Sequence, residues 1–434
     1  MPQEINKTPP DWLTVKMKLI EVALCREFLQ KHPVKCIGGA FFNVDGRIPE
    51  ETIQRMIYEE IKDHVTMGVS KKVKNLIGVL KLECEAAPPP FQTDRIHVAN
   101  GTVFLDGSFS EEKEFCRNRL PVTYNPSAPV PAVWLWYLHE LLIPEDILTV
   151  QEYFGYCLIP TTKAQKMLMI IGKGGEGKSR LGIVLRALLG SNMNTGSIAK
   201  IESSPFARAD LEHQLLLLDD DMKLEALSQP NHLKAIITAE LPMDLERKGE
   251  QSYQGDLRVR FLGLGNGSLQ SLYDRTQGFY RRQIILTTRD KPTDRVDDPY
   301  LAEKMCAELE GIFLWALEGL KRLIANDYRF TISDAAKENM EEAISDGNNI
   351  VEFLKSEGYI RFQADQEARS TDLYEVYKLW CRENAENPFA MKSFVSFLKQ
   401  NAKAYGLEYT NKIHYQGGMV RGFWGICIER KLYL

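Results

Sequence analysis

The sequence lacks the features that mark several large classes of protein. Its 434 residues contain no run of about 18 apolar residues, the length from which a membrane-spanning helix is expected. The first residues, MPQEINKTPPDW, are polar and do not resemble the apolar centre of a secretory signal peptide. We therefore expect a soluble, cytoplasmic protein that makes no membrane contact.

A metal-binding cysteine pattern and an excess of positive charge are also absent. The eight cysteines form no C-x-x-C pair and no cluster with histidine, which argues against a zinc site and favours reduced thiols. Lysine and arginine number 54 against 59 aspartates and glutamates, for a net charge of −5. A chain with this charge does not coat nucleic acid with its whole surface, so any contact with nucleic acid must be local.

The most informative stretch, Met167–Gly190, reads MLMIIGKGGEGKSRLGIVLRALLG. Its first five residues are apolar, as in a strand buried in a parallel sheet, and apolar residues recur at helical spacing from Leu181 to Leu188. The segment between them fits the phosphate-loop pattern G-x-x-x-x-G-K-[ST], whose fixed positions are Gly172, Gly177, Lys178 and Ser179. The order of strand, loop and helix predicts a site for a nucleoside triphosphate.

Each part of this stretch has a physical role at a phosphate. A loop with few side chains lets backbone N–H groups approach phosphate oxygens, and Gly174 and Gly175 extend this freedom. The helix that follows points its positive end at the anion. Lys178 would reach the β- and γ-phosphates, and the Ser179 hydroxyl would bind Mg²⁺.

Two later apolar runs end in polar residues. LLLLDDD, Leu215–Asp221, predicts a buried strand with carboxylates at its C-terminal edge, where open α/β sheets bind ligands. Asp219 would hold Mg²⁺ through water and Asp220 would orient or deprotonate the attacking water, with the register of the three acids open by one residue. Another strand ends at Asn266, which could polarise that water against the γ-phosphate.

Basic residues stand out at two places. Asp244–Asp256 predicts a hairpin with Arg247 and Lys248 near its tip, although two basic residues on a turn are usually only solvated. Arg281 and Arg282 enter a further apolar strand. Surface arginines are usually solvated too, but a pair after an Asn-tipped strand suggests an arginine finger.

Helical spacing predicts helices over Asp11–Phe28, Pro49–Val65, Trp134–Leu142 and Ile147–Leu158. The stretch Ile96–Phe109 predicts a hairpin with Asn100–Gly101 as a type I′ turn. Near the C-terminus, two helical segments, Ser370–Asn384 and Phe389–Tyr405, precede a hairpin around Gly417–Gly418, an order that suggests a winged helix.

Five motifs in this order resemble the helicase core of superfamily 3, and more narrowly the phage, plasmid and poxvirus primase-helicase family. The motifs are GKGGEGKS, LLLLDDD, the RKG hairpin, FLGLGN and GFYRR. The stretch NGTVFLDG to LPVTYNPSAPVP resembles the small domain before that helicase, and RSTDLYEVYKLWCREN resembles its trailing winged-helix domain. The resemblance covers roughly residues 90–434.

The resemblance implies an α/β P-loop NTPase of the AAA+ type, with a parallel sheet flanked by helices. With the helical N-terminal pattern, it divides the chain into a mainly helical domain (1–95), a connecting domain (96–160), the AAA+ core (161–335) and a winged-helix-like domain (345–434). The N-terminal part does not resemble a primase catalytic domain, so priming activity is not implied.

Carried over residue by residue, the resemblance gives a set of site residues. They are Lys178 and Ser179 of the phosphate loop, the acidic pair Asp219 and Asp220, the sensor Asn266, the DNA-gripping Lys248 with Arg247, and a finger at Arg281 or Arg282. The implied function is an ATP- and Mg²⁺-dependent DNA helicase in the replication of a phage, plasmid or mobile element. The family assembles as a ring, commonly a homo-hexamer, and moves 3′ to 5′ on single-stranded DNA.

Two other functions fit the same motifs. One is a replication initiator or loader that uses ATP to bind and melt origin duplex DNA without processive unwinding. The other is a DNA-binding initiator whose ATP site only governs assembly. ATP hydrolysis stimulated by single strands separates the last from the others, and strand displacement from a forked duplex identifies the helicase.

Overall fold

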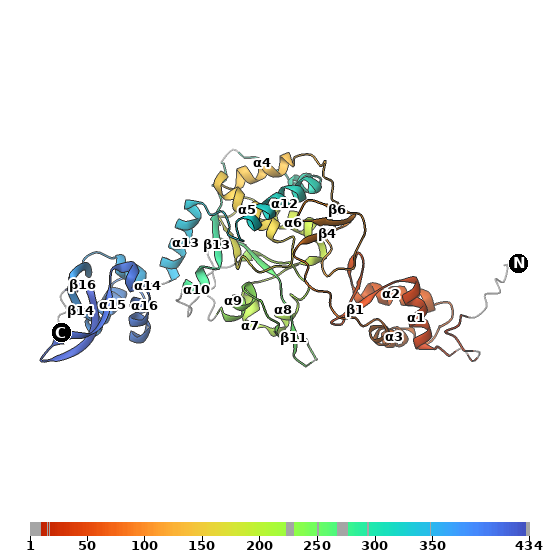
Figure 1. Ribbon diagram of the computed structural model, residues 1–434, viewed down its shortest axis with the longest axis horizontal. Helices are drawn as coiled ribbons and strands as arrows, with labels where there is room; N and C mark the ends of the chain where they lie inside the picture. The colour runs from red at the N-terminus through yellow and green to blue at the C-terminus, as the bar shows by residue number, and fades with distance from the viewer. Residues whose placement is uncertain are drawn as a thin grey trace.

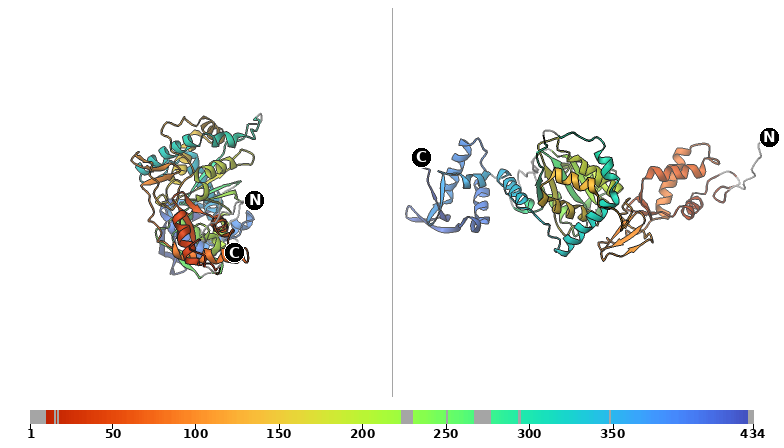
Figure 2. Two further views of the ribbon diagram at one scale, coloured as in Figure 1. Left: turned by 90° about the vertical axis from the view of Figure 1, so that its right-hand side faces the viewer. Right: turned by 90° about the horizontal axis from the view of Figure 1, so that it is seen from above.

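The computed structural model describes residues 10–14, 16, 18–222, 230–249, 251–266, 277–292, 295–347 and 349–430. This part of the chain is elongated, with an α/β unit in the middle and a smaller unit at each end (Figure 1, Figure 2). Each end has its own cluster of buried hydrophobic side chains, and the middle unit has two.

The N-terminal unit packs three helices around a small antiparallel sheet. The helices are α1 (Glu21–Lys31), α2 (Glu50–Ile61) and α3 (Val69–Glu83), and the strands are β1 (Lys35–Ile37), β2 (Ala40–Asn43) and β3 (Gly46–Ile48). The predicted helix start at Asp11 is wrong. Leu13 and Leu19 pair as an antiparallel bridge instead, and Trp12 is buried at 3% exposure without a helix.

The connecting region contains the predicted hairpin. Its strands are β4 (Arg95–Val98) and β5 (Gly101–Phe104), to which β6 (Phe109–Ser110) adds a third. The type I′ turn at Asn100–Gly101 is wrong, because Val98 pairs with Gly101 and neither Ala99 nor Asn100 has the required positive φ. Asn100 instead uses its side-chain amide to bond both backbone groups of Tyr124, each at 2.9 Å.

The middle unit is built on a five-stranded parallel sheet in the order β13-β7-β12-β9-β8. The strands are β7 (Met167–Ile171), β8 (Met193–Thr195), β9 (Leu216–Met222), β12 (Arg260–Gly265) and β13 (Gln283–Thr287). This confirms the predicted α/β architecture with a parallel sheet. The apolar run at Met167–Ile171 coincides with β7.

Helices cover both faces of the sheet. One layer holds α4 (Ala132–Leu141), α5 (Pro144–Tyr156), α6 (Ser179–Leu189), α11 (Leu301–Cys306) and α12 (Leu309–Ala325). The other holds α7 (Ala199–Ser203), α8 (Pro205–Ala209) and α9 (Asn231–Ile237). Because strand side chains alternate between faces, Leu168 and Ile170 pack in the first layer and Met167 and Met169 in the second.

Three further elements belong to this unit or connect it onward. They are a 3-10 turn, η1 (Gly190–Asn192), and the helices α10 (Gln277–Tyr280) and α13 (Asp334–Gly347). Helix α13 runs along β13 toward the C-terminal unit (Figure 1). Within the described residues, no helix combines the length and the apolar character that crossing a bilayer requires.

The C-terminal unit has the chain order helix, strand, two helices, hairpin. Its elements are α14 (Asn349–Lys355), β14 (Ile360–Arg369), α15 (Ser370–Glu383), α16 (Met391–Gln400), η2 (Ala402–Tyr405), β15 (Glu408–Tyr415) and β16 (Gly418–Ile428). The sheet order is β14-β16-β15, and Tyr415 pairs with Gly418 across the predicted hairpin. The second predicted helix is shorter than expected, because its last turn is the separate 3-10 turn η2.

Candidate functional site

The phosphate-loop motif lies between the carboxyl end of β7 and the start of α6. Gly174, Gly175 and Gly177 have φ values of +106°, +85° and +101°, which residues with a side chain rarely adopt. At Gly172 the limit is space, since a Cβ there would lie 2.4 Å from the Thr288 hydroxyl oxygen. The loop therefore keeps its backbone bare, as close approach to a phosphate requires.

The donors of this loop converge on a carboxylate of the loop itself. Lys178 is 8% exposed, and its Nζ lies 2.8 Å from Oε2 of Glu176, which is 4% exposed. The backbone N–H groups of Lys173 and Gly174 donate to the other oxygen, Oε1, at 2.5 and 2.7 Å. Glu176 stands at a free position of the motif, so the motif carries no information about it.

The acidic run divides between the two faces of the sheet. Asp219 is buried, and its Oδ2 accepts a 2.8 Å hydrogen bond from the N–H of Ile198, just before α7. Burial raises the pKa of Asp219. Asp220 is exposed on the other side. Burial raises the pKa of Tyr137, and the nearby charge of Asp220 adds to this effect. The Tyr137 hydroxyl donates to the Gly177 carbonyl of the phosphate loop at 3.0 Å. Asp220 is therefore the acid on the phosphate-loop side.

Asn266 ends β12, the strand next to β7, and its side chain reaches the loop. The Gly172 N–H donates to the Gly265 carbonyl at 3.0 Å, which holds the two strand ends together. A Cβ on Gly174 would lie 3.8 Å from Nδ2 of Asn266. The structure thus brings the predicted sensor asparagine beside the phosphate loop.

Arg281 and Arg282 lie at the opposite end of the sheet. They precede β13, which pairs with β7 in parallel so that Gln283 faces Met167. The phosphate loop begins after the other end of β7, roughly 15 Å further along a five-residue strand. Arg282 donates to the Gly278 carbonyl in its own chain, whereas the Arg281 side chain is exposed. Neither arginine is placed to meet a phosphate in this chain's own loop.

The predicted basic hairpin is formed by β10 (Met243–Leu245) and β11 (Tyr253–Gly255) and projects beside α8 (Figure 1). Lys248 is exposed at its end and forms no ion pair with the part of the chain described. Arg247 turns back instead. Its guanidinium donates to the Gly38 carbonyl at 2.6 Å and pairs with Glu212 at 2.5 Å.

Sequence reasoning also missed Arg295, whose Nη1 donates to the Glu176 carbonyl at 3.1 Å. Arg295 follows β13 and is distant in sequence from the loop, so no local pattern indicates the contact.

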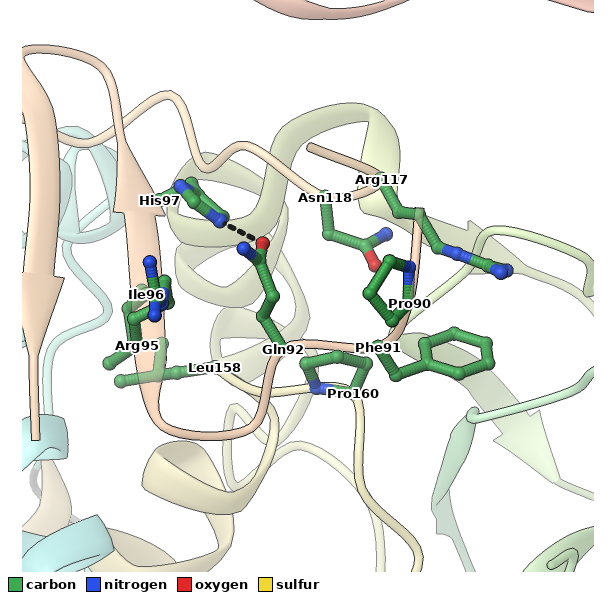
Figure 3. Close-up of a pocket in the computed structure, with 10 residues that line it drawn as sticks. All are labelled: Pro90, Phe91, Gln92, Arg95, Ile96, His97, Arg117, Asn118, Leu158 and Pro160. Carbon is green, nitrogen blue, oxygen red and sulfur yellow. Dashed lines mark hydrogen bonds between the residues drawn. The ribbon is translucent and has the colours of Figure 1, made fainter. Parts of the chain in front are cut away.

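A small cavity in the connecting region is not a nucleotide site. It encloses about 20 Å³, room for one water molecule. Figure 3 shows His97 and Gln92 hydrogen-bonded beside it at 2.6 Å, with Arg117 and Phe91 on the opposite side. None of its lining residues belongs to the phosphate loop.

The chain is similar to one family model and to several solved structures. A model described as a family of unknown function (DUF5906) matches residues 170–282, which contain every candidate site residue from Gly172 to Arg282. The fold is similar to the apo structure of the NrS-1 C-terminal region (305–718), with a TM-score of 0.54, 13% identity, and 93% of this chain and 99% of that chain covered. An A-form apo structure of the same region has a TM-score of 0.52 at 12% identity, covering 93% and 98%.

Proposed function

We propose that this protein is an ATP-dependent DNA helicase of superfamily 3, acting in the replication of a phage, plasmid or other mobile element. The observation that carries the proposal is the meeting of three motifs at one edge of the parallel sheet. The phosphate loop with Lys178, the acids of β9 and Asn266 all lie at the carboxyl ends of adjacent strands. This is where an NTPase of this architecture binds and hydrolyses its nucleotide.

The residues present suit Mg²⁺ bound together with ATP. Mg²⁺ that arrives with phosphates needs only one or two protein ligands. Ser179 begins α6 and would supply a hydroxyl. The Asp219 carboxylate already bonds Ile198, so we assign the metal to Asp220 and the attacking water to Asp221, one residue along the run from the assignment that the motif suggested. The metal would neutralise the charge that develops on the transferred phosphoryl group.

A ring of identical subunits, for which we propose six, would complete the site. Arg281 is too far from its own phosphate loop to touch the nucleotide there, but a residue at a subunit edge can reach the loop of a neighbour. An arginine supplied from outside stabilises the charge of the transition state. The exposed Lys248 of each hairpin would face single-stranded DNA in the pore, where positive charge tracks phosphates without reading sequence.

The C-terminal unit supports the same proposal. Its order of helix, strand, two helices and hairpin, with the sheet order β14-β16-β15, is the order we expect of a winged helix. We propose that it is a DNA-binding accessory to an AAA+ core.

One experiment tests this function. Purified protein should hydrolyse ATP, faster with single-stranded DNA, and should displace a strand from a forked duplex. A chain that hydrolyses ATP and melts origin duplex DNA, but displaces no strand from the forked duplex, would instead be a loader or initiator. A chain that shows no ATP hydrolysis would contradict both.

A further inference from the structure

The phosphate loop of this chain is filled by its own side chain. Three donors point at the Glu176 carboxylate: the N–H groups of Lys173 and Gly174 and the ammonium of Lys178, at distances from 2.5 to 2.8 Å. Backbone N–H groups of a glycine-rich loop and the motif lysine are the groups that hold phosphate oxygens in this kind of loop. The carboxylate therefore occupies the donors that a nucleotide needs.

Burial makes this contact specific rather than an incidental surface pair. The side chains of Glu176 and Lys178 are 4% and 9% exposed, in contrast to those of the neighbouring pair, Lys173 and Asp290, which are 80% and 75% exposed. Burial acts to raise the pKa of Glu176, but Lys178 and the backbone donors outweigh it and the pKa is lowered. The side chain is thus held as an anion.

We propose that Glu176 is an internal phosphate substitute that closes the nucleotide-free site, so that ATP binds only by displacing this carboxylate. The inference rests on the proposed nucleotide site and adds a regulatory element to it. Two anions cannot share these donors, because the carboxylate and a phosphate would compete for the same N–H groups and repel each other.

The backbone allows the exchange. Gly175 and Gly177 flank Glu176, both have positive φ, and a Cβ at Gly175 would meet no atom within 4 Å. Rotation about these glycines can turn residue 176 toward open space while β7 and α6 stay in place. Arg295 donates to the Glu176 carbonyl from outside the loop. This hydrogen bond would either persist or break when the loop opens.

The closed state should lower the apparent affinity for nucleotide. When only a fraction of the molecules has an open loop, the apparent Kd rises in inverse proportion to that fraction. If about one molecule in ten is open, removal of the carboxylate tightens binding about tenfold.

The test is calorimetric titration of the full chain with ATP and Mg²⁺ in four forms: wild type, Glu176→Gln, Glu176→Ala and Asp290→Asn. Asp290→Asn is the matched control, because it also removes one negative charge that contacts this loop, at Lys173, but not one on the phosphate donors. We expect both Glu176 variants to bind about tenfold more tightly and Asp290→Asn to bind like wild type. Without nucleotide, Glu176→Ala should melt at a lower temperature, and the difference should vanish at saturating ATP.

The outcomes separate this inference from the proposed function. Equal or weaker binding by Glu176→Gln, while Lys178→Ala still abolishes binding, overturns the internal substitute and leaves the nucleotide site standing. Wild-type affinity in Lys178→Ala overturns both. Glu176→Gln retains an oxygen that the backbone donors can reach, so the comparison holds even if Glu176→Ala does not fold.

Discussion

Arg247 and Glu212 form an ion pair of 2.5 Å that fastens the basic hairpin to the body of the protein. The same guanidinium donates to the Gly38 carbonyl, in the turn between β1 and β2 of the N-terminal unit. One side chain thus joins three parts of the chain that are far apart in sequence. Arg247 and Lys248, neighbours on one turn, therefore have different surroundings: the first is committed to the protein and the second faces solvent.

The first prediction separates these two residues. Lys248→Ala should change the free energy of unfolding by no more than about 0.5 kcal/mol, because an exposed lysine supports little. It should abolish strand displacement and flatten the salt dependence of single-strand binding, since DNA releases fewer counterions when fewer positive charges meet its phosphates. Arg247→Ala should lower stability by about 1–2 kcal/mol, because its charged hydrogen bonds disappear. Unwinding at the normal rate by Lys248→Ala would remove the residue from the proposed pore.

The second prediction concerns the phosphate-loop lysine. Lys178→Ala should abolish ATP hydrolysis, because no other group reaches the β- and γ-phosphates in its place. It should also destabilise the nucleotide-free protein by about 1–3 kcal/mol, since the buried Glu176 carboxylate loses its ammonium partner. Combining the change with Glu176→Gln should restore most of the stability and none of the hydrolysis. Thermal melting and a phosphate-release assay measure both, and an undiminished turnover would disprove the assignment.

The third prediction assigns the acids of β9. Asp220→Asn should weaken the dependence of ATP hydrolysis on Mg²⁺, and Asp221→Asn should bind ATP but hydrolyse it slowly. Asp219→Asn should mainly lower stability, because its carboxylate holds the Ile198 N–H at the start of α7. Each variant is titrated with Mg²⁺ and melted. If Asp219→Asn alters the Mg²⁺ dependence at unchanged stability, the metal belongs to Asp219 and the water to Asp220.

The fourth prediction is that Arg281 acts on a neighbouring subunit. Arg281→Ala and Lys178→Ala should each be inactive alone, yet mixtures should hydrolyse ATP, because some interfaces pair an intact loop with an intact arginine. Mixtures of Arg282→Ala with Lys178→Ala serve as the comparison, since Arg282 bonds within its own chain. Activity is measured across mixing ratios on protein shown to co-assemble. Failure to recover activity at every ratio would place the finger elsewhere.

The fifth prediction is a pH dependence of stability at His97. Burial, with the nearby charge of Arg119, lowers the pKa of His97 from its ordinary value of 6.5 to about 4. The unfolded chain therefore binds a proton first, and stability falls as the pH drops from about 6.5 to about 4, by at most on the order of 3 kcal/mol. Denaturant unfolding of His97→Gln should show a smaller loss over this window. His414→Gln, a change at an exposed histidine, should follow the wild-type curve.

The parts of the structure that the sequence predicted well depend on local signals. β7, the bare phosphate loop and α6 follow one another within Met167–Gly190, where apolar runs, glycines and helical spacing each act over a few residues. Strand β13 and the hairpin of β10 and β11 are equally local. β14 was missed because only its two ends are buried, so its sequence lacks the alternation of a half-buried strand.

Only the tertiary structure decided which groups the side chains of these predicted elements contact. The run LLLLDDD predicts a strand, but only the structure shows that Asp219 bonds Ile198 and that Asp220 lies on the side of the phosphate loop. The tip of the hairpin is local, yet Arg247 is held by Gly38 and Glu212, about 209 and 35 residues away in sequence. Glu176 is a free position in the motif, and only the structure shows that its buried carboxylate is held by Lys178 and by two backbone N–H groups of the loop. Sequence patterns report periodicity and backbone freedom over short spans, whereas these contacts depend on burial and charge that exist only after distant segments have come together.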